Sequence, residues 1–358
     1  MTADTVGGVW TYALDLAREM PDVEVSLATM GKPLSPDQWA DANAIPNLEV
    51  FESSYKLEWM DEPWHDVRAS GRWLMTLEAA IRPDVVHLNG LCHGALPFEA
   101  PKLVVMHSCV LSWWEAVKGE AVPDSWNRYA EEVRHGIMGA NVVAAPTHAM
   151  MSATERLYGK PSVTQVIPNG RRGIEPKRKE PFVFAAGRMW DEAKNLRALE
   201  AIRDRLSWPL FVAGDGSDLG RLDAEGMRDW LGRASIYAFP AKYEPFGLSV
   251  LEAALAGCAL VLGDIPSLRE NWEGRAIFVH PDDEDGLAQA VERLIADPLL
   301  RERMGRCARE HAQSFSTARC AHGYLRLYRE MLRASDRKRE SFYGAVKAGL
   351  MGIGGKVA

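Results

Sequence analysis

Two glutamates, Glu244 and Glu252, stand eight positions apart in the segment EPFGLSVLE. Chance supplies such a spacing in a chain with 49 acidic residues, so the local context decides its interpretation. The run 236–240 has the apolar pattern of a strand end, and the sequence from Leu248 onward has that of a helix. The corner between them is predicted to present unpaired backbone N–H groups and the positive end of a helix dipole, which suit a phosphate.

Each polar or small residue of this corner has a predicted task. Gly247 lets a ligand approach the backbone closely, because glycine has no Cβ. Glu244 is predicted to face a cleft, where a carboxylate accepts hydrogen bonds from sugar hydroxyls. Glu252, about one turn into the helix, is placed to accept from ribose hydroxyls. A solvated helix face is the alternative for Glu252, and the apolar residues around it argue against that alternative.

A second strand–turn–helix junction carries two cations. The predicted strand 182–186 ends at the turn residue Gly187, and Arg188 and Lys194 flank the entry to the predicted helix 195–206. An arginine can bind two oxygens of a diphosphate at once, and a lysine adds a point charge. We interpret the pair as a site for a diphosphate leaving group, with a surface charge cluster as the alternative.

Length, composition and charge limit the class of function. The chain has 358 residues, 47% of them hydrophobic and 25% charged, which is ordinary for a soluble globular protein of two domains. Its net charge of -7 argues against a general nucleic-acid binder. The five cysteines include no Cys-x-x-Cys pair, and no apolar run reaches the roughly 18–20 residues that cross a bilayer. We expect a cytoplasmic protein with reduced thiols, no metal site and no nucleic-acid partner.

Apolar runs of strand length alternate with amphipathic stretches of helix length almost from end to end. This alternation is typical of parallel sheets covered by helices on both faces, an α/β fold. The segment 168–181, rich in Pro, Gly and charge, is the best linker candidate, and a charged surface loop is the alternative. Two doubly wound domains would then face each other, with ligand sites at the carboxyl ends of their strands. The predicted strands are 23–30, 85–88, 103–107, 142–145, 182–186, 210–213, 236–239, 259–262 and 276–279, and the predicted helices are 195–206, 248–256, 284–296 and 317–332.

The start of the chain is unusual because the Gly-Gly turn at Gly7 and Gly8 follows only a few residues. A helix entered through a glycine turn normally follows a strand, and only residues 1–4 are available to form one. We therefore expect that the native protein starts several residues upstream and that this sequence lacks most of the first strand.

The order and setting of these motifs resemble the retaining glycosyltransferases of family 4. GGVW, GRMWDEAKN and EPFGLSVLEAALAG occur in family order, with RPDVVHLNG, VVMHS, APTHAM and VIPNG between them, so the resemblance covers nearly the whole chain. The block EPFGLxxxE is highly specific, whereas the other pieces are individually weak. The resemblance implies the GT-B fold, two Rossmann-like domains facing across a cleft. It places an acceptor domain at 1–167, a nucleotide-sugar domain at 168–316, and a helix and tail at 317–358 that return to the N-terminal domain.

The resemblance implies a site for a nucleoside diphosphate sugar. Gly7 and Gly8 match the glycine turn that admits the donor diphosphate, and Arg188 and Lys194 match the pair that neutralises it. His107, at the end of a predicted strand, matches a histidine close to the donor sugar, and a histidine that caps a strand end is the alternative. Because positive charge at the leaving group supplies the electrostatic stabilisation, we expect no metal and no other cofactor.

The EPFGL block carries the remaining implied roles. Glu244 matches the glutamate that holds hydroxyls of the donor sugar, and Glu252 matches the glutamate that binds the ribose. Phe246, Gly247 and Leu248 match positions that contribute backbone contacts. The family retains the anomeric configuration, and this sequence offers no evident covalent nucleophile. We therefore expect the acceptor to attack the same face, assisted by the departing phosphate.

The sequence departs from the family at VAGDGSDLGRLDAEG. Relatives have a further helix and strand after the Gly-Asp-Gly turn, whereas here only three residues separate Gly216 from Gly220. In the family this neighbourhood helps to hold the nucleotide base, so no base is predicted. A dinucleotide-binding fingerprint starting at Gly214 is the alternative, but the spacing of its third glycine is wrong.

The N-terminal half is expected to bind the acceptor, a glycan, a lipid-linked sugar or a small molecule. Six of the 12 tryptophans fall between Trp59 and Trp126. Trp113 and Trp114 are the candidates for stacking on an acceptor sugar, with core packing as the alternative. The tail from Asp336 onward is expected to be disordered, with peripheral contact to an anionic membrane as the alternative.

Two other functions fit the same fold. A nucleotide-sugar epimerase would rearrange the donor sugar instead of forming a new linkage, and the EPFGLxxxE context argues against it. A catalytically impaired nucleotide-sugar-binding module would keep the fold without turnover because of the two shortened segments. A panel of nucleotide sugars separates the three functions.

Overall fold

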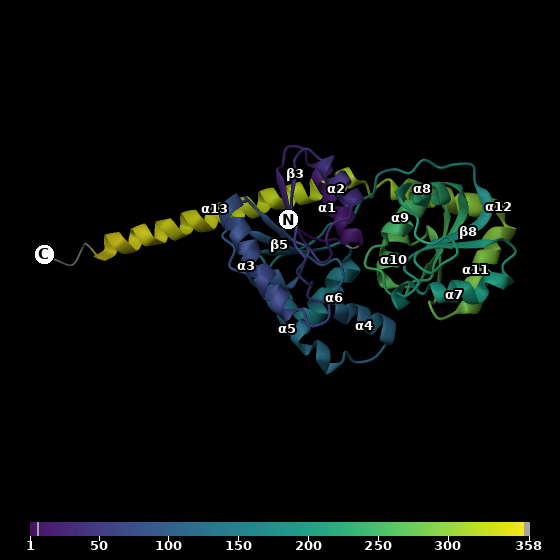
Figure 1. Cartoon of the computed structure of the whole chain (residues 1–358), viewed down its shortest axis with the longest axis horizontal. Helices are drawn as coiled ribbons and strands as arrows, with labels where there is room; N and C mark the ends of the chain where they lie inside the picture. Colours follow the sequence, from purple (N-terminus) through teal and green to yellow (C-terminus); the bar gives the residue numbers. More distant parts are fainter. Residues whose placement is uncertain (6, 354–358) are drawn as a thin grey trace.

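The computed structural model describes residues 1–5 and 7–353, with side chains to residue 337 (Figure 1). Its strands form three parallel sheets, two in the N-terminal half and one in the C-terminal half. The N-terminal half contains β1 Thr2–Asp4, α1 Gly8–Glu19, β2 Val25–Met30, α2 Pro36–Asn43, β3 Leu48–Phe51, α3 Trp64–Ile81, β4 Val86–Leu88, β5 Lys102–Val105, α4 Val110–Lys118, α5 Asn127–Gly139, β6 Val142–Ala145, α6 His148–Tyr158 and β7 Thr164–Val166. The C-terminal half contains β8 Glu180–Ala186, α7 Leu196–Ile202, β9 Leu210–Ala213, α8 Ala224–Arg233, β10 Ala234–Phe239, α9 Leu248–Leu255, β11 Ala259–Gly263, α10 Pro266–Trp272, β12 Ala276–Val279, α11 Glu284–Ala296, α12 Pro298–Ala312 and α13 Thr317–Ile353.

The two N-terminal sheets, with strand orders β1-β2-β3 and β4-β5-β6-β7, lie side by side. Asn89, directly after β4, donates from its backbone N–H to Thr2 Oγ1 at 2.8 Å and from Nδ2 to the Thr2 carbonyl at 2.7 Å. The strand expected within residues 1–4 is therefore confirmed as β1, and it lies between β2 and β4. β1 is the edge strand of its own sheet, and Asn89 after β4 holds its other side. The upstream start stays a prediction.

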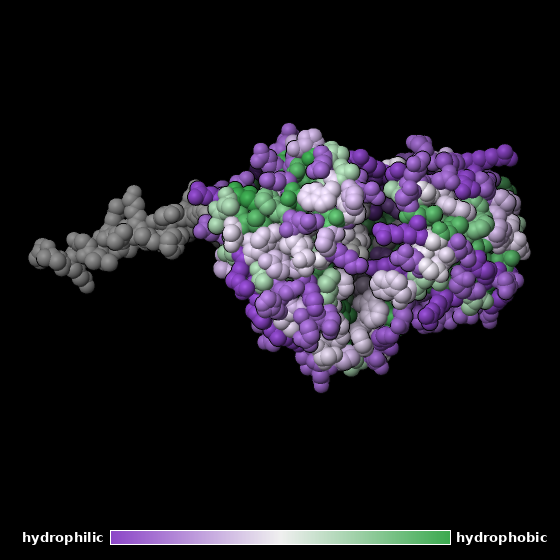
Figure 2. Space-filling view, in the orientation of Figure 1, coloured by the Kyte–Doolittle hydropathy of each residue, from purple (hydrophilic) through white to green (hydrophobic). Residues whose placement is uncertain are grey.

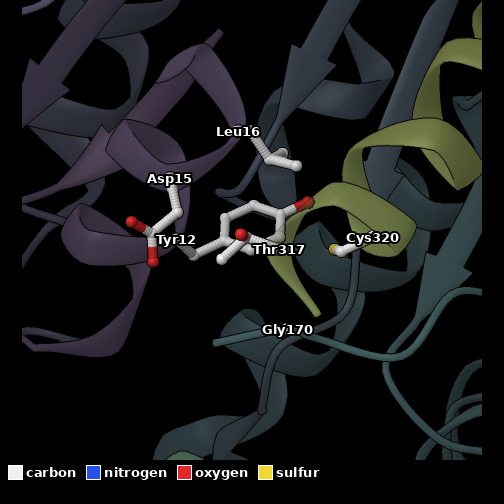
Figure 3. Close-up of a pocket in the computed structure, with 6 residues that line it drawn as sticks. All are labelled: Tyr12, Asp15, Leu16, Gly170, Thr317 and Cys320. Atoms are coloured by element: carbon white, nitrogen blue, oxygen red, sulfur yellow. The ribbon is translucent and has the colours of Figure 1, made fainter. Parts of the chain in front are cut away.

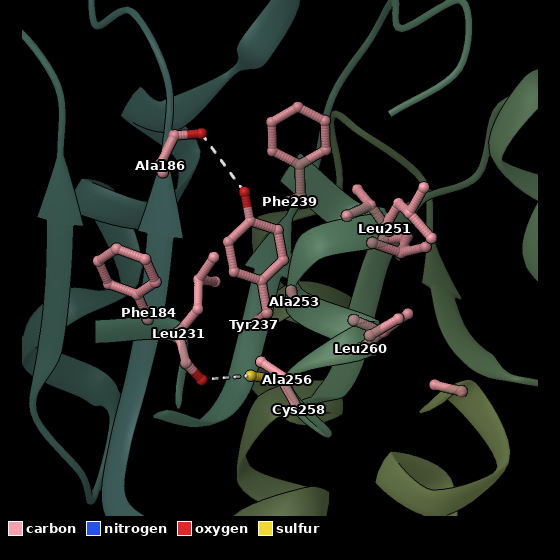
Figure 4. Close-up of a cluster of buried hydrophobic side chains, with 14 of the residues drawn as sticks. Phe184, Ala186, Leu231, Tyr237, Phe239, Leu251, Ala253, Ala256, Cys258 and Leu260 are labelled. Carbon is pink, nitrogen blue, oxygen red and sulfur yellow. Dashed lines mark hydrogen bonds between the residues drawn. The ribbon is translucent and has the colours of Figure 1, made fainter. Parts of the chain in front are cut away.

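The C-terminal sheet has the strand order β12-β11-β10-β8-β9, so β9 is an edge strand. Its strands are buried on both faces because helices cover both, as expected for a parallel sheet. On one face, Phe184, Tyr237 and Leu260 come from three neighbouring strands and pack together (Figure 4). The chain passes from β9 to α8 and then to β10, without the further helix and strand expected of relatives.

Two segments connect the halves and lie against each other. The segment 168–181 leads from β7 into β8, and the backbone of Arg171 pairs with Ser316, just before α13. The helix α13 then packs on α1, where Tyr324 contacts Tyr12, and it runs along the N-terminal half in Figure 1. The predicted return of the C-terminal helix to the N-terminal half is confirmed. The domain boundaries at 167/168 and 316/317 stay predictions.

The helix α13 extends far beyond the predicted end at residue 332, to Ile353. The expectation of a disordered tail is therefore wrong for residues 336–353. Lys, Arg, Glu, Ala, Leu and Met in this stretch favour helix and outweigh its three glycines. Residues 354–358 lie outside the described residues. No helix in the described part is long and apolar enough to cross a membrane, and hydrophilic residues predominate on the face shown in Figure 2.

Most of the predicted elements are confirmed to within a few residues. The strands at 142–145, 210–213 and 276–279 and the helix at 284–296 have the predicted bounds. The prediction omitted β3 and β7, which have 4 and 3 residues, because they are short and have little buried apolar surface. Their hydrophobic pattern is too weak to separate them from loops.

Candidate active site

The predicted strand–turn–helix corner is confirmed. The strand β10 ends at Phe239, and α9 begins at Leu248 with Gly247 as its N-cap. Gly247 has a φ of 91°, in the left-handed region, and a Cβ added there would lie 3.1 Å from Leu268 Cδ2. Glycine is therefore required by both backbone conformation and space.

Glu244 is the centre of the hydrogen bonds in this corner. Its Oε1 accepts from the backbone N–H groups of Gly247 at 3.0 Å and Phe246 at 3.4 Å, and its Oε2 lies 2.8 Å from Lys194 Nζ. The expectation that the turn leaves these N–H groups unpaired is therefore wrong, because Glu244 caps its own turn. In the described part of the chain, the N–H groups of residues 248–250 donate to no acceptor, so the helix end keeps donors for an anion.

Backbone contacts between two loops bring Lys194 to Glu244. Lys194 ends the 3₁₀ helix η3 (Glu192–Lys194), which follows β8 and its turn. The carbonyl of Ala193 in η3 accepts from the N–H groups of Lys242 at 2.8 Å and Tyr243 at 3.3 Å, in the loop after β10. Since β8 and β10 are neighbours, their carboxyl ends deliver a cation and a carboxylate to one place.

Arg188 does not join this pair. Its Nη2 donates to Asp191 Oδ2 at 3.0 Å, and its guanidinium lies 4.9 Å from the centroid of the exposed Trp190 ring. Asp191 was not predicted as a site residue. It is 8% exposed and also accepts from Ala193 N–H at 3.1 Å, so it caps η3 while it holds Arg188. An Asp before a short helix is an N-cap signal that the sequence contained.

The glycine turn of the N-terminal half lies against the corner. Gly7 has a φ of 100° and precedes α1, and no atom lies within 4 Å of a Cβ added there. A Cβ added to Gly8 would lie 3.4 Å from Leu248 Cδ1, the first residue of α9. The structure therefore brings together two segments that the sequence separates by about 240 residues.

His107 follows β5 and is held as a neutral side chain. Its Nε2 lies 2.7 Å from Asn89 Oδ1, and its ring meets that of Tyr12 edge to face at 4.7 Å. Burial lowers the pKa of His107 to about 4. The loop after β5 reaches the other half of the molecule, since Cys109 N–H donates to the Tyr243 hydroxyl at 3.4 Å. The carboxyl ends of β5 and β10 therefore face each other.

Glu252 is in α9, as predicted, and it is paired with a residue that the sequence did not indicate. Its Oε1 lies 2.8 Å from Arg171 Nε, and Arg171 Nη1 also donates to Asp15 Oδ2 at 3.0 Å. The pKa of Glu252 is raised above its ordinary value because burial outweighs the opposing charge of Arg171. Arg171 lies in a charged linker where every basic residue fits a solvated loop, so no local signal distinguishes it.

Trp113 and Trp114 lie in α4, with their ring centroids 6.1 Å apart. Lys118 Nζ lies 5.8 Å from the centroid of the Trp113 ring and 2.8 Å from Glu192 Oε2 in η3. The two tryptophans are therefore near the contact between the halves. Their role in acceptor binding stays a prediction.

Comparison with known proteins matches two parts of the chain to glycosyltransferases. Residues 6–171 match the family described as Glycosyltransferase Family 4, and residues 180–297 match Glycosyl transferases group 1. A D-inositol 3-phosphate glycosyltransferase from Kribbella flavida is 35% identical over 384 residues, which cover 90% of each chain. An alpha-maltose-1-phosphate synthase from Mycobacterium tuberculosis is 34% identical over 297 residues, 66% of this chain and 75% of that protein. The chain belongs to glycosyltransferase family 4.

Solved structures show the same fold. Sucrose-phosphate synthase from Thermosynechococcus elongatus superposes with a TM-score of 0.78 at 19% identity. The superposition covers 93% of this chain and 96% of the synthase chain. HepE from Anabaena, in complex with UDP and glucose, has a TM-score of 0.71 at 16% identity, over 92% of this chain and 100% of its own. The GT-B fold expected from the sequence is confirmed. The comparisons do not favour the epimerase or the impaired module.

The predicted donor residues of this glycosyltransferase do not line the two pockets described next. A small pocket between α1 and the start of α13 is lined by Tyr12, Asp15, Leu16, Gly170, Thr317 and Cys320 (Figure 3). A second groove is formed by residues 166–168 and 314–326. Lys194 is in an ion pair with Glu244, and Arg171 is in an ion pair with Glu252, so both glutamates that the family resemblance assigns to the donor have a cation as partner. In the described part of the chain, no cluster of three or more His, Cys, Asp or Glu residues could hold a metal ion.

Proposed function

We propose that this glycosyltransferase transfers a sugar from a nucleoside diphosphate sugar to a hydroxyl of a glycan, a lipid-linked sugar or a small molecule. We further propose that it retains the anomeric configuration and needs no metal or other cofactor. The observation that carries this proposal is the contact of Lys194 with Glu244 at the carboxyl ends of β8 and β10. The bond to be broken joins a phosphate to a sugar. The cation suits the phosphate, and the neighbouring carboxylate suits the sugar hydroxyls.

Lys194 and Glu244 are proposed to separate their tasks when the donor binds. Lys194 Nζ, 18% exposed, turns to the β-phosphate, and Glu244, 15% exposed, accepts from sugar hydroxyls while its Oε1 stays on the Gly247 N–H. Arg188 and the first N–H groups of α9 add positive charge to the diphosphate. The HepE structure with UDP and glucose supports a donor of this class.

The reaction then proceeds at the anomeric carbon. The bond from that carbon to the diphosphate oxygen breaks, and its electron pair leaves with the phosphate. The acceptor oxygen forms the new bond on the same face, and its proton passes to the departing phosphate oxygen. Lys194 stabilises the negative charge that grows on this oxygen, which is the largest electrostatic demand of the step. His107, neutral because of its lowered pKa, provides hydrogen bonding near the sugar without adding charge.

A panel of nucleotide sugars tests this proposal with the wild-type enzyme, Lys194→Ala and Lys118→Ala. We expect the wild type to hydrolyse one donor slowly without acceptor, and EDTA to leave this rate unchanged. Lys194→Ala is expected to lower kcat at saturating donor by about 100-fold. Lys118→Ala also removes a lysine from a 2.8 Å ion pair between the halves, and it should change kcat little because that pair is more exposed.

Each outcome of the panel has one meaning. Interconversion of nucleotide sugars would identify an epimerase, and neither hydrolysis nor binding of any donor would identify an inert module. Unchanged turnover in Lys194→Ala would remove this lysine from the leaving-group site. Loss of activity in EDTA that added metal restores would contradict the metal-independent mechanism.

A further inference from the structure

Arg171 lies where the chain crosses from the N-terminal half to the C-terminal half, and its backbone is fixed there. Its N–H donates to the Phe315 carbonyl at 3.0 Å, and it pairs with Ser316 in the segment that crosses back. A Cβ added to Gly170 would lie 2.2 Å from the Ser316 oxygen, so the two crossing segments are in direct backbone contact. The side chain of Arg171 therefore extends from a rigid anchor.

The guanidinium of Arg171 connects carboxylates from the two halves of the molecule. Its Nη1 lies 3.0 Å from Asp15 Oδ2 in α1, and its Nε lies 2.8 Å from Glu252 Oε1 in α9. The side chains of Arg171 and Asp15 are each 15% exposed, and that of Glu252 is 24% exposed. Figure 3 shows Asp15 on α1, across the small pocket from Cys320 of α13. The cluster is therefore built from three distant segments and is largely shielded from water.

The geometry leaves part of Glu252 available. A guanidinium carries five N–H donors in a planar fork, so one arginine can hold two carboxylates, which one lysine ammonium does less well. Arg171 Nε lies 2.8 Å from Oε1 of Glu252 in an ion pair, without the geometry of a hydrogen bond, and in the described part of the chain Oε2 of Glu252 has no hydrogen-bond partner. Burial raises the pKa of Glu252 above its ordinary value, and the charge of Arg171 offsets part of this rise.

We propose that Arg171 is a positioning residue for the ribose of the donor. It fixes Glu252 through Oε1, with Asp15 as its anchor on α1, and leaves Oε2 to accept from the ribose hydroxyls. The inference rests on the proposed function and on the ribose-binding role that the family resemblance implies for Glu252. The helix α1 begins at Gly8, in the glycine turn predicted to admit the diphosphate. The contacts from Asp15 through Arg171 to Glu252 therefore also align the ribose site with the N-terminal half.

The test compares a nucleoside diphosphate with its 2′,3′-dideoxy analogue as ligands of the full chain. The base is uracil, adenine or guanine, whichever the donor panel selects. The wild type is expected to bind the parent compound about 10- to 100-fold more tightly, because oriented hydrogen bonds to a carboxylate are lost in the analogue. Arg171→Met is expected to reduce this preference to about 3-fold or less, with the analogue's own affinity nearly unchanged. The dissociation constants are measured by calorimetry.

Further variants separate positioning from a general structural defect. Arg172→Met is the matched control. Arg172 is the next residue, is 61% exposed and pairs at 3.7 Å with Glu19 of α1, the helix that also carries Asp15. Its preference should equal that of the wild type. Asp15→Asn keeps Arg171 and Glu252 but weakens the ion pair that holds Arg171 on α1. It should therefore reduce the preference for the parent nucleoside diphosphate partially, and Arg171→Lys should do the same. Circular dichroism and thermal unfolding verify that each variant is folded.

Three outcomes would overturn the inference in different ways. A full preference in folded Arg171→Met and Asp15→Asn would show that Glu252 needs no positioning. A greater preference would show that Arg171 competes with the ribose for Glu252. If the wild type itself does not distinguish the two ligands, Glu252 does not bind the ribose, and the role that the family resemblance implies for it falls, whereas the proposed sugar transfer does not. The Lys194→Ala measurement is independent of all three results.

Discussion

The carboxylate of Glu244 caps its own turn and at the same time holds Lys194. Its Oε1 accepts from the Gly247 N–H at 3.0 Å, and its Oε2 lies 2.8 Å from Lys194 Nζ. A neutral amide at this position could keep the turn but not the charge that holds the lysine. Glu244→Gln therefore isolates the electrostatic role of this residue from its structural one.

The pKa of His107 gives a pH dependence of stability. Burial lowers this pKa from 6.5 to about 4, so the folded state binds the proton less readily than the unfolded state. Above pH 6.5 the ring is neutral in both states and contributes nothing. Between pH 6.5 and 4 the unfolded state takes up the proton, so the free energy of unfolding falls as pH falls, by up to about 1.4 kcal/mol per pH unit.

The variant His107→Gln tests this dependence by urea unfolding at a series of pH values. The glutamine keeps a donor for Asn89 Oδ1 but does not titrate. The free energy of unfolding of the wild type minus that of the variant should be constant above pH 7 and should decline as the pH falls from 6.5 to 4. Parallel curves over that interval would show that the folded His107 has an ordinary pKa.

At the scale of elements, close backbone contact between loops decides where the site residues lie. The turn after β8 and the turn after β9 touch at two glycines, and a Cβ added to Gly214 would lie 1.8 Å from the Gly187 oxygen. Gly214 also has a φ of 144°, and its N–H donates to the Gly220 carbonyl at 2.8 Å. The short loop 214–220 is therefore closed on itself and supports the turn that precedes Arg188.

Gly214→Ala is predicted to displace this turn. The clash with Gly187 adds about 1 to 3 kcal/mol of destabilisation to the cost of a positive φ. Donor affinity should fall as well, because Arg188 and η3 follow Gly187 directly. Gly216→Ala is the matched control, since Gly216 has a φ of 84° and no atom within 4 Å of the added Cβ, and only the backbone cost of about 1 to 2 kcal/mol applies. Equal effects of the two variants on unfolding and affinity would contradict this account.

The scale of elements also shows what local pattern can and cannot predict. The corner from β10 to α9 was predictable, because the buried run 236–239, Gly247 and the apolar helix after it are all local signals. The extension of α13 to Ile353 differs from the predicted disorder, since helix-favouring residues outnumber the glycines there. Short strands such as β7 were missed because their stability comes from a neighbouring strand and not from their own sequence.

At the scale of the whole molecule, polar contacts hold the two halves together. Glu270 of α10 accepts from the N–H groups of His148 at 2.7 Å and Ala149 at 2.8 Å, the first residues of α6 in the other half. Beside it, Thr147 donates from Oγ1 to the Pro245 carbonyl at 3.0 Å, within the EPFGL block. A carboxylate at a helix N-terminus is favoured by the helix dipole and by the free N–H groups there.

Glu270→Ala is predicted to open the molecule. The loss of this cap weakens the contact by roughly 1 kcal/mol. The radius of gyration from small-angle X-ray scattering should rise in the absence of ligand and return on saturation with nucleoside diphosphate, with donor affinity lowered about fivefold. Glu273→Ala is the control, because Glu273 directly follows α10 and pairs at 2.8 Å with Arg269 of that helix. An unchanged radius in Glu270→Ala would show that other contacts hold the halves.

The sequence by itself determined the family, the alternating α/β fold and the corner that carries Glu244 and Glu252. These features depend on hydrophobic period, turn residues and the order of motifs, all of which are local in the chain. Only the tertiary structure decided the partners. It joined Lys194 to Glu244 and placed Arg171 between Asp15 and Glu252. The physical reason is that strand neighbours and chain crossings are set by long-range packing, and an isolated arginine or glutamate gives no sign of which distant charge will face it.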